Sequence, residues 1–258
     1  MALLDIKNLS IYFGGVKAVQ DVSFSLEQGD FVGLIGPNGA GKTTVFNAVT
    51  GVVPPTKGDV YFDGKRLNGI RPDKISHLGI ARTFQNIRIY PKMSALNNVA
   101  IGRESRPSYN TVSAMLSLPY VSKKDREIEK TCLHYLDQVG ILQYKDTEVG
   151  SLPYGIQRKV EIARAMATNP KLLFLDEPAA GMNTAESLEL VSFLRQLHKD
   201  TGIAIVLIEH HLEVVMEVCR TIHVLNLGQM LATGTPEEIQ KNPDVITAYL
   251  GERRRHNA

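Results

Sequence analysis

The chain has 258 residues, a formal net charge of +2, and an ordinary composition of 22% charged and 43% hydrophobic residues. So small a charge argues against nucleic acid as a partner, and apolar runs such as 203–208 are far shorter than the roughly 18 residues of a membrane span. The isolated Cys132 and Cys219, and a start without a secretory signal, predict a cytosolic protein with reduced cysteines.

The front of the chain predicts strands and then a phosphate-binding loop. Residues 3–26 contain short β-like runs that Gly14-Gly15 interrupts. The apolar residues 31–35 indicate a buried strand, and residues 45–49 indicate a helix. A glycine loop with the pattern GxxxxGK[ST] joins that strand to that helix, which is the context of a phosphate-binding loop. The loop consists of Gly36, Pro37, Asn38, Gly39, Ala40, Gly41, Lys42, Thr43 and Thr44.

The chemistry of this loop predicts a nucleoside triphosphate as ligand. Its glycines allow successive backbone N–H groups to face the phosphates, and the helix that follows adds the partial positive charge of its N-terminus. Lys42 is expected to reach the β- and γ-phosphates, and the Thr43 hydroxyl to ligate Mg²⁺.

Later elements alternate between helices and buried strands. After a strand and tight turn at 59–64, residues 94–167 follow helical periods, with 103–124 as an insertion or connection within that block. Buried strands are predicted at 171–175 and 203–208, separated by an amphipathic helix. A helix is predicted to start after Thr235, whose hydroxyl would cap the N-terminus of that helix. Continuous apolar strands that alternate with helices indicate a parallel sheet covered on both faces.

Polar residues follow two of these strands directly. Asp176 stands where a Mg²⁺-organising carboxylate belongs, and Glu177 beside it would orient and deprotonate the attacking water. His210, after the second strand, is interpreted as a contact to the γ-phosphate or to that water. Gln85 is a further candidate ligand of Mg²⁺ or water. Because ligands of parallel sheets bind beyond the carboxyl ends of the strands, these groups should meet around one nucleotide.

The set of motifs resembles the ATP-binding subunit of ABC transporters over nearly the whole chain. The resemblance identifies the glycine loop as Walker A, 172–177 as Walker B with the catalytic glutamate, Gln85 as the Q-loop and His210 as the switch histidine. Phe13, with Tyr12 as its competitor, falls where the family stacks an aromatic ring on adenine. The implied fold is an α/β P-loop ATPase core with a parallel sheet, an N-terminal antiparallel β subdomain and an inserted helical subdomain.

The family signature LSGGQ aligns with a segment that departs from it. The segment consists of Leu152, Pro153, Tyr154, Gly155 and Ile156. Pro153 offers neither the hydroxyl nor the N–H of the family serine, whereas Gly155 and the helix N-terminus after it could still contact a phosphate of the partner subunit. Asn183 occupies the D-loop aspartate position, and His211 replaces an aspartate common in the family. These departures bear on contacts across the subunits more than on nucleotide binding.

The resemblance also implies an internal division of the single 1–258 domain. An ATP-binding core with the β subdomain is expected at about 1–93 and 165–235, a helical subdomain with the signature segment at about 94–164, and a C-terminal helix and tail at about 236–258. The Arg-rich end 253–256 is interpreted as a solvated terminus, with contact to anionic lipid headgroups as the alternative.

Subfamily features resemble branched-chain amino acid importers. They include the Glu-Pro-Ala-Ala-Gly of 177–181 and the ending 242–252. The implied protein hydrolyses ATP with Mg²⁺ at the cytoplasmic face of the membrane, as a peripheral subunit. Its implied partners are membrane permease subunits, a second ATP-binding subunit in a homo- or heterodimer, and indirectly a periplasmic or extracellular substrate-binding protein, with no nucleic acid. Alternatives are an ABC ATPase for urea, amide or lipid transport, a soluble non-transport ABC ATPase, and a non-catalytic nucleotide sensor.

Overall fold

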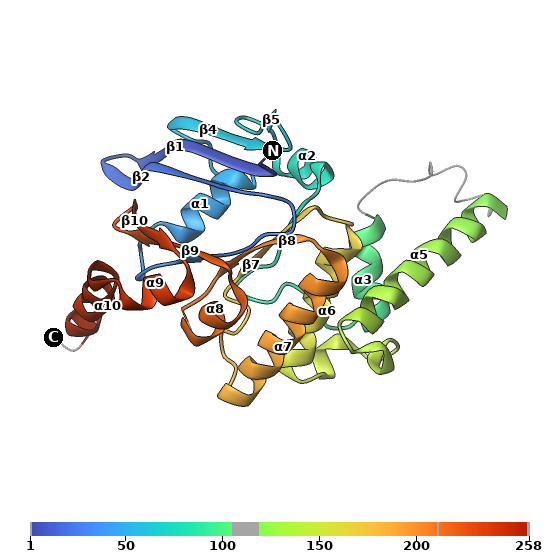
Figure 1. Cartoon of the computed structure of the whole chain (residues 1–258). Helices are drawn as coiled ribbons and strands as arrows, with labels where there is room; N and C mark the ends of the chain where they lie inside the picture. Colours follow the sequence, from blue (N-terminus) through green and yellow to red (C-terminus); the bar gives the residue numbers. More distant parts are fainter. Residues whose placement is uncertain (1, 105–118, 211, 257–258) are drawn as a thin grey trace.

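The computed structural model describes residues 2–104, 119–210 and 212–256, and within them the strands form two sheets (Figure 1). The larger sheet has the order β10-β9-β3-β8-β7-β6, in which every neighbouring pair is parallel except the β9–β10 hairpin. Its strands are β3 (Phe31–Ile35), β6 (Ile80–Arg82), β7 (Leu172–Asp176), β8 (Ala204–Ile208), β9 (Thr221–Asn226) and β10 (Gln229–Gly234).

The central strands are buried along their whole length, as their continuous apolar sequences predict. Successive side chains of a strand point to opposite faces, so Phe174 packs into one core and Leu173 with Leu175 into another. The sheet is therefore covered on both sides, which confirms the predicted α/β class.

The smaller sheet is antiparallel, with the order β2-β1-β4-β5. Its strands are β1 (Leu4–Phe13), β2 (Val16–Leu26), β4 (Lys57–Phe62) and β5 (Lys65–Arg66). Gly14 turns the chain between β1 and β2 at a φ of 56°, which a residue without a Cβ adopts at little cost. Helix α1 (Lys42–Val49) packs between the two sheets through Val45, Phe46 and Val49.

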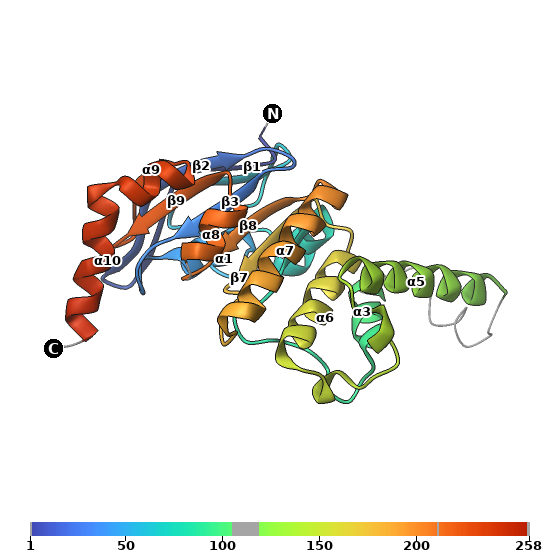
Figure 2. The same ribbon diagram turned by 60° about the horizontal axis from the view of Figure 1, so that its bottom comes forward.

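The other face of the larger sheet carries a second set of helices (Figure 2). They are α7 (Thr184–Thr201), α8 (Leu212–Val218), α9 (Pro236–Lys241) and α10 (Pro243–His256), joined by one side of α6 (Tyr154–Ala167). The predicted stripe of α7 is buried, through Leu190, Val191, Leu194 and Leu197. Thr235 caps α9 in a capping box with Glu238, as the sequence indicates.

A third core belongs to the helical group of α3 (Ala95–Glu104), α5 (Pro119–Gln138) and α6. The short turns η1 (Leu142–Tyr144) and η2 (Val149–Ser151) connect α5 to α6. Figure 2 shows this group on the side of the molecule away from α10. Gly102 lets α3 approach α6 closely, because a Cβ there would lie 2.3 Å from the Arg164 carbonyl oxygen. Residues 105–118, within the expected insertion, lie outside the described residues.

Two features of the larger sheet were not expected from the sequence. The edge hairpin β9–β10 adds an antiparallel strand, and the short β6 brings Arg82 beside β7. Helix α2 (Pro72–Leu78) leads into β6.

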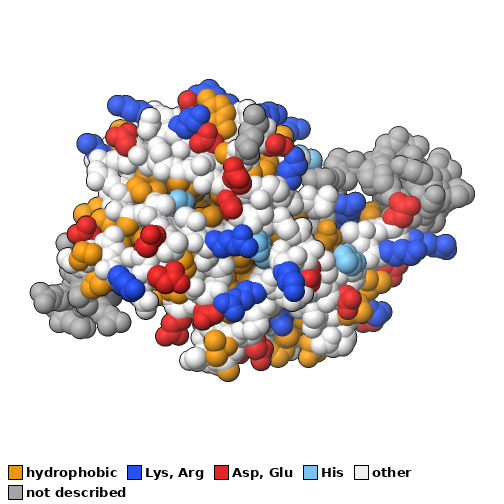
Figure 3. Space-filling view, in the orientation of Figure 1, with side chains coloured by type: hydrophobic (Ala, Val, Ile, Leu, Met, Phe, Trp, Pro, Cys, Tyr) orange, Lys and Arg blue, Asp and Glu red, His pale blue; other side chains and the backbone are white. Residues whose placement is uncertain are grey.

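On the face drawn in Figure 3, acidic and basic side chains are interspersed, in keeping with a net charge of +2.

Candidate nucleotide site

The order of the strands assembles the candidate site. In the larger sheet β8 lies between β3 and β7, and all three run in the same direction. Their carboxyl ends therefore bring three segments to one edge: the glycine loop after Ile35, Asp176 with Glu177, and Glu209 with His210. Sequence reasoning predicted this convergence.

The glycine loop needs glycine at two of its positions. Gly36 has a φ of 147° and Gly41 a φ of 101°, and an added Cβ would lie 2.0 Å from the Leu225 oxygen in the first case and 2.6 Å from the Ala18 oxygen in the second. No side chain caps the N-terminus of α1 at Gly41. The first turn of that helix can therefore offer its N–H groups to an anion.

Lys42 lies buried inside its own loop. Its Nζ donates to the carbonyl oxygens of Gly36 at 2.7 Å and Pro37 at 2.9 Å. The ammonium group is thus held against the backbone of its own loop. Thr43 next to it is exposed, with a hydroxyl suited to a hard cation.

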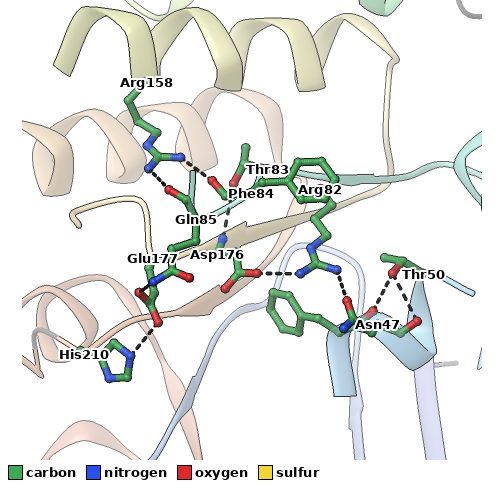
Figure 4. Close-up of polar contacts among 11 residues, drawn as sticks. Asn47, Thr50, Arg82, Thr83, Phe84, Gln85, Arg158, Asp176, Glu177 and His210 are labelled. Carbon is green, nitrogen blue, oxygen red and sulfur yellow. Dashed lines mark hydrogen bonds and ion pairs between the residues drawn. The ribbon is translucent and has the colours of Figure 1, made fainter. Parts of the chain in front are cut away.

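Glu177 is the centre of a three-residue cluster (Figure 4). Gln85 Nε2 donates to Glu177 Oε2 at 2.6 Å, and His210 Nε2 lies 2.6 Å from Glu177 Oε1. Glu177 itself has a φ of 48°, a conformation that is uncommon outside glycine and occurs preferentially at functional sites. The structure therefore brings together the three residues that sequence reasoning placed around the attacking water.

A buried carboxylate that was expected at this sheet edge, but without a role of its own, supports that cluster. Glu209 Oε1 accepts the Ala179 N–H at 2.7 Å, and its Oε2 accepts the His210 N–H at 3.1 Å. Glu209 thereby ties the end of β8 to the loop after Glu177. The position of Glu209 directly before His210 is the sequence feature that could have indicated a role at the site.

Asp176 is paired with an arginine that sequence reasoning also missed. Arg82 Nη2 lies 2.7 Å from Asp176 Oδ2, and Arg82 Nη1 donates to Asn47 Oδ1 of α1 at 2.6 Å. The guanidinium also lies 5.7 Å from the centre of the Phe46 ring and 5.2 Å from that of Phe84. One side chain therefore connects α1, β7 and the segment before Gln85 (Figure 4).

The oxygen donors at this edge suit magnesium. The hydroxyl of Thr43, the amide oxygen of Gln85 and the carboxylate of Asp176 belong to the ligand class that Mg²⁺ prefers. Among the described residues no group of three or more His, Cys, Asp or Glu could hold a metal ion. A cation here would therefore need further oxygen ligands from phosphate and water.

The ring of Phe13 is available for stacking. It ends β1 with 51% of its surface exposed, whereas its neighbour Tyr12 is half-buried. Adjacent residues of a strand face opposite sides of the sheet, so the two rings cannot share one role. The exposure favours Phe13.

The segment aligned with the signature opens α6. Pro153 is the N-cap residue, and no side chain caps that end of the helix. Leu152 is buried, Tyr154 is 41% exposed, and Gly155 and Ile156 are half-buried. An uncapped helix N-terminus remains for a phosphate, as the sequence indicates.

Asn183 lies at an exposed helix start. Its side chain accepts the Glu186 N–H at 3.0 Å, while Glu186 Oε2 accepts the Asn183 N–H at 2.9 Å, so the pair forms a capping box for α7. His211 lies outside the described residues.

No helix in the described part of the chain is both long and apolar enough to cross a membrane.

Comparison with known proteins agrees with this geometry. Residues 19–180 match the ABC transporter family, and residues 229–254 match the family described as branched-chain amino acid ATP-binding cassette transporter. The chain is 41% identical to the high-affinity branched-chain amino acid transport ATP-binding protein BraF of Pseudomonas aeruginosa, over 97% of this chain and 98% of the relative. It is 40% identical to LivG of Escherichia coli K12, a protein of the same description, with the same coverage.

Solved structures give the same result for the fold. The ADP conformation of MJ1267, an ATP-binding cassette of an ABC transporter, superposes with a TM-score of 0.85 at 32% identity and covers 98% of this chain and 100% of that one. A nucleotide-free cassette from an ABC transporter gives a TM-score of 0.83 at 31% identity, covering 96% and 99%. The chain therefore belongs to the ABC transporter family, as an ATP-binding cassette of the branched-chain amino acid group.

Proposed function

We propose that this chain binds and hydrolyses ATP with Mg²⁺ to drive the import of branched-chain amino acids through separate membrane subunits. The observation that carries the proposal is the contact of Gln85 and His210 with the two carboxylate oxygens of Glu177, at the sheet edge that also presents Lys42. The cargo is supported by the relatives named above and by the match over 229–254.

The glycine loop would hold the triphosphate. The Lys42 ammonium would exchange the carbonyl oxygens of Gly36 and Pro37 for β- and γ-phosphate oxygens, which bear full negative charge. The N–H groups of the loop and of the first turn of α1 would complete the contacts. The exposed ring of Phe13 would stack on the adenine.

Magnesium fits the donor set at the sheet edge. When bound, Mg²⁺ neutralises the charge on the β- and γ-phosphates. Thr43 would supply its hydroxyl and Asp176 its carboxylate, which is the arrangement expected of a P-loop ATPase. The amide nitrogen of Gln85 is already committed to Glu177, so the amide oxygen is the atom available to the cation.

Glu177 would orient the attacking water and accept its proton. Both of its oxygens are engaged, so one of them must be released to the water. Movement of Gln85 toward Mg²⁺ would free Oε2, while His210 keeps hold of Oε1. We therefore assign Glu177 as the general base and His210 as the residue that maintains its geometry.

Hydrolysis would occur between two cassettes. The N-terminus of α6, with residues 152–156, would face the γ-phosphate held by the glycine loop of a second copy or of a related chain. Asn183 would lie at the same interface. In this assignment residues 1–93 and 165–235 form the ATP-binding core, 94–164 the helical part, and 236–258 the C-terminal helix and tail.

A cavity of about 380 Å³ lies between that core and part of the helical group. Ile75, Ala81 and Phe84 line it from the core, and Ile101 and Arg164 from the helical part. We propose that a segment of a membrane subunit docks here, which would place the chain peripherally at the cytoplasmic face. A substrate-binding protein on the other side of the membrane would act through those subunits.

Co-purification tests this proposal. The Glu177→Gln protein, which should trap the ATP-bound pair, is recovered from solubilised native membranes, and its partners are identified by mass spectrometry. A multi-span permease is the expected partner. The complex reconstituted with the wild-type chain should then show ATP-dependent uptake of leucine and isoleucine but not of urea. Recovery of soluble partners only would contradict the transport function, and uptake of urea alone would contradict the cargo.

A further inference from the structure

Arg158 occupies an unusual position for a charged residue. It lies in the second turn of α6, and its side chain is 0% exposed. Its Nη1 donates to the Phe84 carbonyl oxygen at 2.7 Å and its Nη2 to the Gln85 carbonyl oxygen at 2.9 Å. Figure 4 shows the guanidinium reaching from α6 to these two successive carbonyl groups.

Two side chains of α6 orient that guanidinium. Glu161 Oε2 accepts from Arg158 Nη1 at 2.7 Å, and the Tyr154 hydroxyl accepts from Nη2 at 3.2 Å. The other oxygen of Glu161 accepts the Arg88 N–H at 3.2 Å. The helix therefore contacts the segment 84–88 at both of its ends.

Stability alone is a poor explanation for this arrangement. A buried ion pair loses in desolvation about as much as it gains in attraction, and apolar residues of similar volume often serve stability equally well. Arg158 Nε is also without a hydrogen-bond partner among the described residues, which adds a cost. What a guanidinium provides and an apolar residue does not is a rigid fork of donors that fixes the direction of two carbonyl groups.

The two carbonyl groups that Arg158 fixes belong to the backbone that presents Gln85. The side chain of Gln85 donates to Glu177, so the line of contacts runs from Tyr154 through Arg158 and Gln85 to Glu177. Tyr154 lies in the segment assigned to the nucleotide of the partner subunit. A shift of the first turn of α6 would therefore reach the glutamate of the same chain.

We propose that Arg158 is a positioning residue that holds the Phe84–Gln85 backbone where the Gln85 side chain can reach Glu177 and then move to Mg²⁺. Tyr154 links this hold to the signature segment. The inference rests on the proposed ATPase function. Arg158 acts through Gln85, whose backbone carbonyl oxygen it binds.

Arg158→Lys tests the proposal, because lysine keeps the charge opposite Glu161 but cannot direct both carbonyl groups. We expect kcat for ATP hydrolysis to fall by at least about tenfold, with the Kd for ATP within about twofold, the pattern of a residue that acts on the chemical step. Amide hydrogen exchange over residues 84–88 should rise in the nucleotide-free protein, since the Arg88 N–H relies on the same helix face.

A second, milder variant and a control distinguish a positioning role of Arg158 from a general loss of folded structure. Tyr154→Phe removes one hydroxyl and should lower kcat by about two- to fivefold and raise exchange over 84–88 to a smaller extent. Arg195→Lys is the control, because Arg195 of α7 also donates to a carbonyl oxygen and a carboxylate, both of Glu217 and neither in the segment 84–88. It should leave kcat and exchange over 84–88 unchanged.

The inference is overturned if folded Arg158→Lys keeps kcat and exchange over 84–88 within twofold of the wild-type values. A loss of thermal stability with unchanged kcat would likewise leave Arg158 as a structural residue only. Failure of the ATPase function itself is visible separately, because the wild-type protein would then not bind ATP. If the isolated wild-type protein binds ATP but does not hydrolyse it, hydrogen exchange over residues 84–88 decides whether Arg158 holds that segment.

Discussion

The guanidinium of Arg82 lies 2.7 Å from the carboxylate of Asp176, with only 10% and 5% of the two side chains exposed. Its second nitrogen donates to Asn47, which belongs to the helix that follows the glycine loop. The carboxylate assigned to Mg²⁺ therefore has a cationic partner that Asn47 holds in place. This pair compensates a charge that burial would otherwise make costly.

Arg82→Met should destabilise the protein by about 3 kcal/mol, since it leaves the Asp176 carboxylate buried without its partner. The matched control is Arg66→Met, which breaks the exposed pair of Arg66 with Asp59 and should cost at most about 1 kcal/mol. Urea denaturation of both variants in nucleotide-free buffer measures the difference. Equal free energies of unfolding for the two variants would contradict the importance of the buried pair.

Lys42→Ala should weaken ATP binding by at least about tenfold, because a charge-assisted contact to phosphate contributes about 1.5–3 kcal/mol. Titration calorimetry measures the affinity, and circular dichroism checks that the loop and its helix still fold without the contacts of Lys42 to Gly36 and Pro37. Lys57→Ala, at an exposed lysine of β4, is the control. An unchanged affinity in Lys42→Ala would refute the assignment of the phosphate loop.

Acid should destabilise the protein through His223. Burial lowers the pKa of this side chain to about 4. Its Nδ1 lies 2.9 Å from Thr233 Oγ1, and its Nε2 has no hydrogen-bond partner among the described residues. Between pH 6.5 and 4 this histidine is protonated in the unfolded chain, where its pKa is near 6.5, but stays neutral in the folded chain. The free energy of unfolding is therefore largest above about pH 6.5 and falls by about 3 kcal/mol toward pH 4.

The His223→Gln variant isolates this effect from the titration of carboxyl groups. The free energy of unfolding of the wild type should drop between pH 6.5 and 4 by more than that of the variant, while the variant of an exposed histidine, His77→Gln, should follow the wild type. Parallel pH profiles for wild type and His223→Gln would show that His223 does not carry the loss.

The sequence predicted the parts of the site that local patterns encode. The glycine pattern places Gly36 and Gly41 where the backbone has positive φ angles. Glu177 directly follows one apolar strand, and His210 is the second residue after another. Because the strands are parallel neighbours, their ends meet, and no further information is needed to place these groups together.

The residues that support this site were not predictable in the same way. Arg82, Arg158 and Glu209 act through partners that are far away in the sequence, such as Asp176 for Arg82 and Gln85 for Arg158. A charged residue in an amphipathic helix or at a strand end is usually solvated, so the pattern carried no sign that these three are buried. Their roles become visible only with the tertiary contacts. The β9–β10 hairpin was missed for a related reason, since His223 and Asn226 interrupt the apolar pattern of β9.

Steady-state hydrolysis by Glu177→Gln, measured together with ATP binding, tests the central assignment most directly. The glutamine keeps the size of the side chain and can still contact Gln85 and His210, but it cannot accept a proton from water. Turnover should fall by about two to four decades, the size of a general-base effect, while the affinity for ATP survives. Hydrolysis at close to the wild-type rate would contradict the role of Glu177 and with it the proposed mechanism.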